Sequence, residues 1–219
     1  MSSASLRRPI PGDRGLLSWS TLTRTCGILA LLGAGSAAFA NLIAGWLVED
    51  YSMVSQSISA LAAGERSWMQ DYGLYGLAVG IAALALGLWV RRSPDRSGMI
   101  GIAALSLIAL DIGVIAFFHG YAKKDVSGMH LHTYAVFALG LLFAVSSFLM
   151  GLSLRRSEQG YAVFSFVICV SWILSAPFFF SVPSNWFGLY ERGVGLLLLA
   201  WVCAMGWLIF IRTWEVRRV

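Results

Sequence analysis

The residues best suited to chemistry in this chain are its three histidines, His119, His130 and His132, which lie close to Asp125. Imidazole and carboxylate groups are the usual zinc ligands, and an imidazole can also serve as general base toward a serine. His130 and His132 are two residues apart, so they would diverge by about 200° on a helix and point the same way only on an extended segment. The spacing matches no standard metal motif such as HExxH, so a hydrogen-bonded structural role is the alternative for each histidine.

A second group of polar side chains lies between Tyr51 and Leu61, a segment that is rich in serine and contains Gln56. On a helix, Val54, Ile58 and Leu61 would form one apolar stripe, because they follow the spacing i, i+4 and i+7. The pattern predicts a short amphipathic helix lying at a membrane interface. Two alternatives stay open for its polar face: the serines face water, or they line a pocket together with Gln56. The two serines expected to matter are Ser55 and Ser57.

The pair Glu191-Arg192 stands at the start of the last apolar segment of the chain. These charges can pair with other groups of a ligand site. The structural alternative is that they cap a helix, because a Glu near a helix N-terminus is stabilised by the helix dipole.

Asp111 lies near the middle of a long apolar segment, where a carboxylate costs on the order of 3 kcal/mol. It must therefore face other helices, be protonated or have a partner. No Lys or Arg lies at a matching depth, so the expected partners are serine or backbone groups of a neighbouring helix. His119 follows two helical turns later and about 80° around the helix, so a polar path from His119 to Asp111 is geometrically possible.

The elements that position these residues are six apolar segments of spanning length. The chain has 219 residues, of which 58% are hydrophobic and 12% are charged, whereas soluble domains usually carry roughly 25% charged residues. Its mean hydropathy is +0.74. Because a membrane-spanning helix needs about 20 apolar residues, hydropathy predicts an all-α bundle of six spans at residues 26–48, 72–90, 99–121, 133–154, 161–180 and 193–214. The expected organisation is a cytoplasmic N-terminal segment at 1–25, a transmembrane domain at 26–214 and a cytoplasmic tail at 215–219.

The charges predict the orientation of these spans. Twelve of the sixteen Lys and Arg residues flank the two termini and the connections after spans two and four, and four lie in the other connections. The positive-inside rule therefore predicts cytoplasmic termini in an inner membrane, with the serine segment, the histidines and Glu191-Arg192 on the outer side. The first apolar segment is expected to span the membrane rather than to be cleaved as a signal peptide, because it continues past Ala38-Phe39-Ala40 to Val48.

Several other features receive structural interpretations. The net charge of +5 is explained by topology, and no basic stretch is interleaved with aromatic residues, so a nucleic-acid partner is not expected. Small residues such as Gly33 and Ala37, or Gly76 and Gly80, have the spacing of close helix packing. Trp and Tyr near the ends of the spans are interpreted as interfacial anchors, among them Trp46, Trp68, Trp89, Trp186 and Trp214.

The chain resembles a family of bacterial and archaeal membrane proteins called domain-of-unknown-function family nine-nine-eight. The resemblance rests on the stretch from Val54 to Leu61, the Asp- and His-bearing loop from Asp125 to His132, and the Gly-Leu-x-Glu-Arg segment from Gly188 to Arg192. It covers nearly the whole chain and implies six helices with an outward-facing polar cluster, but no established activity or cofactor. In this family the paired histidines are usually about a helical turn apart, and Asp111 has no counterpart.

Together these observations predict an inner-membrane protein with a polar pocket on its outer side, where a lipid headgroup or small amphiphile binds. The predicted pocket residues are Ser55, Gln56, Ser57, His119, Asp125, His130, His132, Glu191 and Arg192. One alternative is a membrane-embedded hydrolase or transferase that uses a His or a metal held by His119, Asp125, His130 and His132. Others are a proton-coupled transporter using Asp111 and an accessory subunit of a complex. No cofactor is expected, with zinc and haem as alternatives, and membrane lipids are the expected partners.

Overall fold

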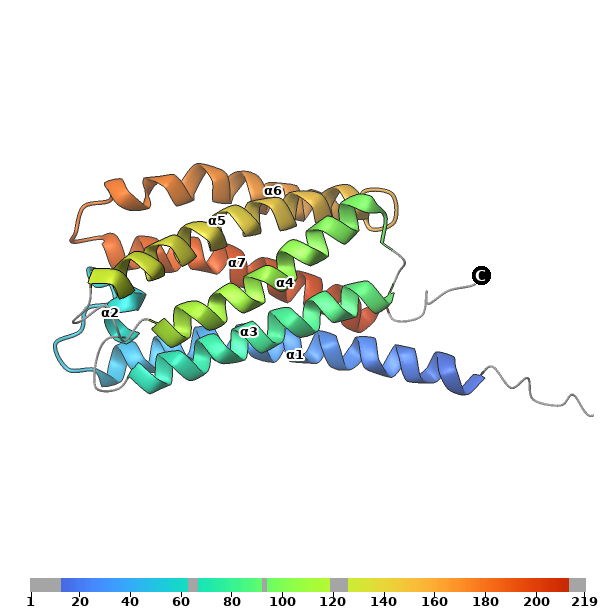
Figure 1. The fold of residues 1–219 in the computed structure, drawn as a ribbon, viewed down its shortest axis with the longest axis horizontal. Coiled ribbons are helices and arrows are strands. Elements are labelled where there is room, and N and C mark those ends of the chain that lie inside the picture. The colour runs from blue at the N-terminus through green and yellow to red at the C-terminus, as the bar shows by residue number, and fades with distance from the viewer. Residues whose placement is uncertain (1–12, 63–66, 92–93, 119–125, 213–219) are drawn as a thin grey trace, which may run out of the picture.

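The structure is a computed structural model that describes residues 13–62, 67–91, 94–118 and 126–212. These residues form an all-α bundle, as the hydropathy predicts, and no strand occurs among them (Figure 1). The elements in chain order are α1 (Asp13–Leu47), α2 (Ile58–Ala62), α3 (Ser67–Arg91), α4 (Arg96–Phe118), α5 (Val126–Leu154), α6 (Gln159–Ser175), the 3-10 helix η2 (Ala176–Ser181) and α7 (Phe187–Ile211).

Six of the described helical segments are long and apolar enough to cross a membrane, which confirms the predicted number of spans. They are Trp19–Leu47, Ser67–Arg91, Arg96–Phe118, Leu131–Leu154, Gln159–Phe179 and Phe187–Ile211. Their outward surface is apolar: Leu32, Phe39, Leu110 and Leu141 are all more than half exposed. Such a surface suits acyl chains rather than water.

Two elements differ in detail from the sequence expectation. The predicted amphipathic helix is limited to α2, and residues 51–57 form turns instead. Ser57 explains this boundary because its hydroxyl accepts a hydrogen bond from the Ala60 N–H at 3.0 Å, as a helix N-cap does. The fifth span also changes character, since Pro177 cannot continue the α-helical hydrogen bonds of α6 and the chain tightens into η2.

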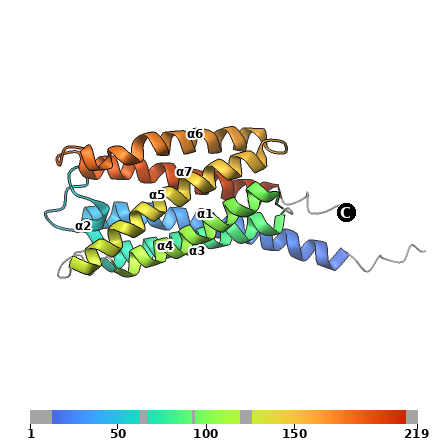
Figure 2. The ribbon, with the colours of Figure 1, turned by 45° about the horizontal axis from the view of Figure 1, so that its top comes forward.

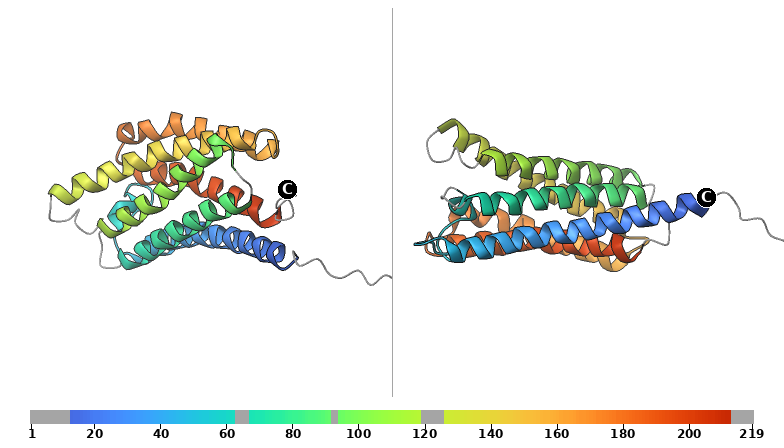
Figure 3. Two further views of the ribbon diagram at one scale, coloured as in Figure 1. Left: turned by 45° about the vertical axis from the view of Figure 1, so that its right-hand side comes forward. Right: turned by 90° about the horizontal axis from the view of Figure 1, so that it is seen from below.

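Helices α1 and α3 run side by side along their length, which the views from other directions also show (Figures 2 and 3). A Cβ added to Gly33 would lie 2.5 Å from the Gly76 carbonyl oxygen and 2.8 Å from the Gly80 Cα. The Ser36 hydroxyl lies within hydrogen-bond distance of the Gly33 carbonyl at 2.8 Å and the Gly73 carbonyl at 3.3 Å. The predicted packing of small residues is therefore a backbone contact between two spans.

An aromatic group fills the interior between α5, α6 and α7. The Phe143 ring makes edge-to-face contacts with Trp172 at 4.7 Å and Trp201 at 5.7 Å between ring centroids. Each indole N–H has an acceptor, because Trp172 donates to the Gly140 carbonyl and Trp201 donates to the Ser165 hydroxyl, both at 3.0 Å. The tryptophans interpreted as anchors differ from these: Trp46, Trp68, Trp89 and Trp186 are all more than half exposed, and Trp214 lies outside the described residues.

The α1–α3 contact leads to a stability prediction. Gly33→Ala places its methyl group against backbone atoms that cannot rotate away, so the helices must separate, which we expect to lower the free energy of unfolding by about 2 kcal/mol. Gly35→Ala is the matched control on the same helix, because a Cβ there meets nothing within 4 Å. Thermal unfolding of both variants in one detergent measures the difference. Equal melting temperatures would contradict the backbone contact.

Candidate functional site

The bundle has two chemically different ends. We call the end where α1 begins and α7 ends the terminal end, and the opposite end, which carries residues 48–57, α2 and residues 182–186, the loop end (Figure 1). Of the residues predicted to form the pocket, all those that the structure describes lie at the loop end. His119 and Asp125 lie outside the described residues, and so does the side chain of His130.

Arg192 joins three elements of the loop end. Its guanidinium donates to five acceptors. Nε donates to the side-chain amide oxygen of Asn41 at 3.0 Å, and Nη2 donates to the Tyr51 hydroxyl at 2.7 Å. Nη1 donates to the backbone carbonyls of Met53 at 2.9 Å, Gln56 at 3.1 Å and Gly188 at 2.9 Å. These acceptors belong to α1, residues 51–56 and α7. A planar fork of donors suits this arrangement, which a lysine ammonium could not reproduce.

Tyr51 continues this network toward α2. Its hydroxyl accepts from Arg192 and lies 2.8 Å from the Ser57 carbonyl and 3.1 Å from the Gln56 carbonyl, to which it can donate. Burial raises the pKa of the Tyr51 phenol above its ordinary value, although the hydrogen bond from Arg192 acts in the opposite direction. The phenol therefore keeps its proton at neutral pH and remains a donor.

Glu191 is a helix cap, although of a helix other than its own. Its Oε2 accepts a hydrogen bond from the Ile58 N–H at 2.7 Å, the first N–H of α2. Together with the Ser57 hydroxyl, it satisfies two of the N–H groups that every helix leaves open at its start. Glu191 and Arg192 of α7 thus both bind the serine segment. Close approach also requires Gly188, because a Cβ there would overlap the Gln56 carbonyl.

His132 of α5 also contacts α2. Its Nε2 is 3.2 Å from the hydroxyl oxygen of Ser59. Sequence reasoning singled out Ser55 and Ser57, whereas the hydroxyl that meets a histidine belongs to Ser59. Ser59 could have been identified from its place within α2, because the Ser57 hydroxyl already caps the start of that helix.

The serine segment also has hydrogen bonds of its own. The Gln56 side-chain oxygen accepts from the Ser52 N–H at 3.0 Å, and the Ser52 hydroxyl accepts from the Ser55 N–H at 3.4 Å. Through Ser59 and backbone groups, rather than through the Ser55 and Ser57 hydroxyls that the sequence singled out, the serine segment contacts both His132 and the Glu191-Arg192 pair. We call them the loop-end cluster. Their role in ligand binding stays a prediction, and no group of three or more potential metal ligands occurs among the described residues.

Asp111 lies within the α4 span, as predicted, and is partly buried. Its Oδ2 is buried, and no donor among the described residues reaches that atom. It sits one turn from the buried Ile108 and Ile115, at the border of the face that α4 packs against the bundle.

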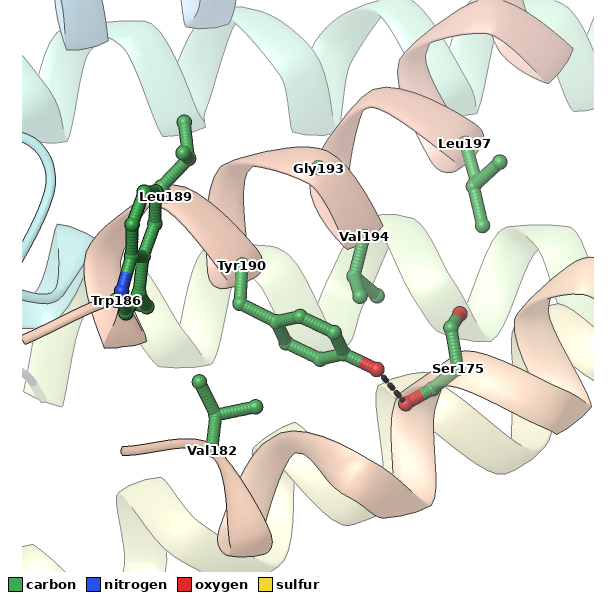
Figure 4. A pocket seen from close by; sticks show the side chains of 8 residues that line it. All are labelled: Ser175, Val182, Trp186, Leu189, Tyr190, Gly193, Val194 and Leu197. Atoms are coloured by element: carbon green, nitrogen blue, oxygen red, sulfur yellow. Dashed lines mark hydrogen bonds between the residues drawn. The ribbon is translucent and has the colours of Figure 1, made fainter. Parts of the chain in front are cut away.

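An apolar cleft of about 380 Å³ lies beside the loop-end cluster, between η2 and the first turns of α7 (Figure 4). Its lining residues come from the end of α6, the connection after η2 and α7: Ser175, Val182, Trp186, Leu189, Tyr190, Gly193, Val194 and Leu197. Tyr190 spans the cleft and donates its hydroxyl to the Ser175 carbonyl at 2.7 Å. That carbonyl belongs to the last residue of α6, so Tyr190 satisfies a backbone acceptor near the helix end.

Hydropathy alone did not reveal this cleft. The signals for it are Pro177, which ends α6 before the span is complete, and Gly193, at which a Cβ would meet nothing within 4 Å. The polar residues that drew attention in the sequence hold the neighbouring loop, and Leu189 connects the two features. It lines the cleft while its N–H donates to the Val54 carbonyl at 2.9 Å.

The Arg192 network can be tested by a change that keeps the charge. Arg192→Lys supplies three donors from a point charge instead of a fork, so several carbonyl groups lose their partners, and we expect a loss of about 2 kcal/mol in stability. Amide hydrogen exchange should become faster at Ile58 and Leu189. Arg155→Lys, at an exposed arginine of the terminal end, is the control. Unchanged exchange in Arg192→Lys would mean that the network does not hold the loop.

Comparison with known proteins agrees with the resemblance inferred from the motifs. Residues 31–208 match the model of a family described as "Protein of unknown function (DUF998)". No curated protein and no solved structure matches the chain. The matched range contains the serine segment, α2 and the Glu191-Arg192 pair. This chain, a multi-pass membrane protein by its six apolar helices, belongs to the DUF998 family.

Proposed function

We propose that this protein binds a membrane lipid or similar amphiphile at the loop end, with an acyl chain in the cleft between η2 and α7. The observation that carries the proposal is the apolar lining of a cleft of about 380 Å³. This volume falls in the range of roughly 300–1,000 Å³ that is usual for small-molecule sites. A cleft in a membrane-spanning segment faces lipid acyl chains, which can fill it through van der Waals contacts.

The level of the cleft in the membrane supports an amphiphile as the ligand rather than a purely apolar molecule. Trp186 lies at its loop-end margin, directly before α7, and is 54% exposed. Tryptophan favours the level of the lipid headgroups. A chain in the cleft would thus have its headgroup near residues 51–57, where Gln56 is exposed and Ser55 is partly exposed.

Glu191 and Arg192 take a positioning role in this proposal. They fix residues 51–58 to the first two turns of α7 through the bonds to Ile58, Met53 and Gln56. The same turns carry Leu189, Tyr190 and Gly193, which form one wall of the cleft. The polar network therefore sets the position of the apolar wall.

The proposal also assigns an orientation. Twelve Lys and Arg residues lie at the termini and the connections beside them, and four lie in the opposite connections. This difference supports a cytoplasmic terminal end in an inner membrane. The bound lipid would then come from the outer leaflet.

A second function is favoured by one specific contact, the 3.2 Å between Ser59 Oγ and His132 Nε2. This is the geometry of a serine with its general base. With the ring proton on Nδ1, Nε2 could take the hydroxyl proton while Oγ attacks the carbonyl of an acyl ester. His132 would return that proton to the leaving alcohol, and water would then release the acid from Ser59. Acyl-ester hydrolysis is thus the alternative to binding alone.

The cleft proposal is tested with a phosphatidylcholine that carries a photoreactive diazirine in its acyl chain. In the wild type, cross-links should concentrate in the peptide containing Leu189 and Leu197. Gly193→Leu fills the cleft and should reduce this labelling about fivefold, equivalent to about 1 kcal/mol. Gly195→Leu is the matched control, because a Cβ there also meets nothing within 4 Å but the residue does not line the cleft. Equal labelling of all three proteins would exclude a specific site.

The hydrolase alternative is tested with a fluorophosphonate probe on purified protein. If His132 activates Ser59, the wild type is labelled, Ser59→Ala is not, and His132→Gln reacts about a hundredfold more slowly, within the usual contribution of a general base. Ser55→Ala, in the same segment, should be labelled like the wild type. A wild type without label, or a labelled Ser59→Ala, would remove this alternative and leave the cleft proposal unaffected.

A further inference from the structure

The terminal end holds a buried ion pair that the sequence did not suggest. Arg91, the last residue of α3, is only 8% exposed, and its Nη2 donates to Glu158 Oε1 at 2.7 Å. Glu158 precedes α6 and is 6% exposed. Sequence reasoning treated Arg91 only as a loop charge that determines orientation, whereas its guanidinium lies inside the bundle end.

A third charged residue joins the pair. Arg91 Nε donates to the Arg212 carbonyl at 3.4 Å, and Arg212 Nε lies 3.9 Å from Glu158 Oε2. Two guanidinium groups therefore share one carboxylate. Since Glu158 can neutralise only one of them, the group carries an excess positive charge.

A cavity of about 240 Å³ adjoins this charged group, between α3, α4 and α5. Leu88, Ile102 and Met150 form its apolar walls, and Arg91, Ser153 and Ser157 supply its polar lining. The cavity thus combines a cation with an apolar surface. It lies at the opposite end of the bundle from the cleft beside α7.

The Arg91 guanidinium retains donors for a ligand. Its Nε and Nη2 have acceptors, whereas no acceptor among the described residues binds Nη1. Arg91 lines the cavity, so a ligand there can accept from its two Nη1 protons. An anionic oxygen in the cavity would satisfy them.

Another carboxylate of this end, Asp95, accepts hydrogen bonds from α4 and α5. Its Oδ1 accepts from the Gly98 N–H at 2.9 Å and the Ser153 hydroxyl at 2.6 Å, and its Oδ2 accepts from the Ser97 hydroxyl at 3.1 Å. In the described part of this end, arginines outnumber carboxylates. From α3 to the end of α7, the arginines described at this end are Arg91, Arg96, Arg155, Arg156 and Arg212, and the carboxylates are Asp95 and Glu158. The local field therefore favours an anion.

We propose that this cavity binds a phosphate group through Arg91, and that the phosphate is the headgroup of an anionic phospholipid. Guanidinium groups bind phosphate oxygens with strong, charge-assisted hydrogen bonds. The walls formed by Leu88, Ile102 and Met150 would contact the part of the acyl chain next to the headgroup. Those apolar walls distinguish a lipid phosphate from free inorganic phosphate, which has no apolar part.

The test measures binding of phosphatidylglycerol, diacylglycerol and inorganic phosphate to the full chain in detergent by native mass spectrometry. Glu158→Gln removes the competing carboxylate and should tighten phosphatidylglycerol binding. The double variant Arg91→Gln/Glu158→Gln keeps an amide pair in place of the ion pair and should weaken it about tenfold, or about 1.4 kcal/mol. Arg155→Gln removes one positive charge at an exposed position outside the cavity lining, and should weaken binding far less than the double variant does.

The outcomes separate the sources. Tighter binding of phosphatidylglycerol than of inorganic phosphate supports the lipid, and the reverse order supports a site for free phosphate at the same guanidinium. Equal binding of diacylglycerol, or full binding by the double variant, overturns the proposal. Should the double variant fail to fold, Ser157→Trp provides a second test, because it fills the cavity mouth without replacing a member of the ion pair. Retained phosphatidylglycerol binding in that variant also overturns the proposal.

Discussion

The organisation of the loop end depends on one side chain, the guanidinium of Arg192. It is bonded to α1 through Asn41 and to residues 51–56 through Tyr51, Met53 and Gln56. Backbone carbonyls outside regular structure need partners wherever water is scarce, and membrane proteins satisfy them internally. Arg192 meets that requirement for a loop that has no ladder or long helix of its own. Arg192, which hydropathy marks only as a charge at the border of a span, thus holds the loop end together.

Polar and apolar features of the loop end are complementary rather than separate. The cluster around α2 is attached to the start of α7 through Leu189, Glu191 and Arg192. Beside this attachment the cleft has almost no polar lining apart from the Tyr190 hydroxyl, which is bonded to Ser175. Recognition of an amphiphile needs both properties side by side: a fixed polar margin and an apolar space.

How far the sequence could predict this structure depends on the range of each interaction. Spans are determined by local hydropathy, and the small residues of spans one and two have the spacing of close helix packing, so the spans and these packing faces were predictable. Glu191 and Ile58 are far apart in sequence, so nothing local indicates that one caps the helix of the other. The apolar pattern of Val54, Ile58 and Leu61 predicted too long a helix, because it does not register the Ser57 cap. The pairing of Arg91 with Glu158 was equally hidden, since each residue by itself resembles an ordinary loop charge.

The arrangement of α7 has a consequence for the order of assembly. Helices α1 and α3 are neighbours in sequence and in space, so their contact is available as soon as both have been synthesised. Residues 51–58 lie between them, yet the groups that hold these residues belong to α7, which is synthesised much later. Until α7 enters the membrane, the Ile58 N–H and the Met53 and Gln56 carbonyls lack those partners. The loop therefore reaches its final conformation only after α7 has been synthesised and packed, when Glu191 and Arg192 supply the missing partners.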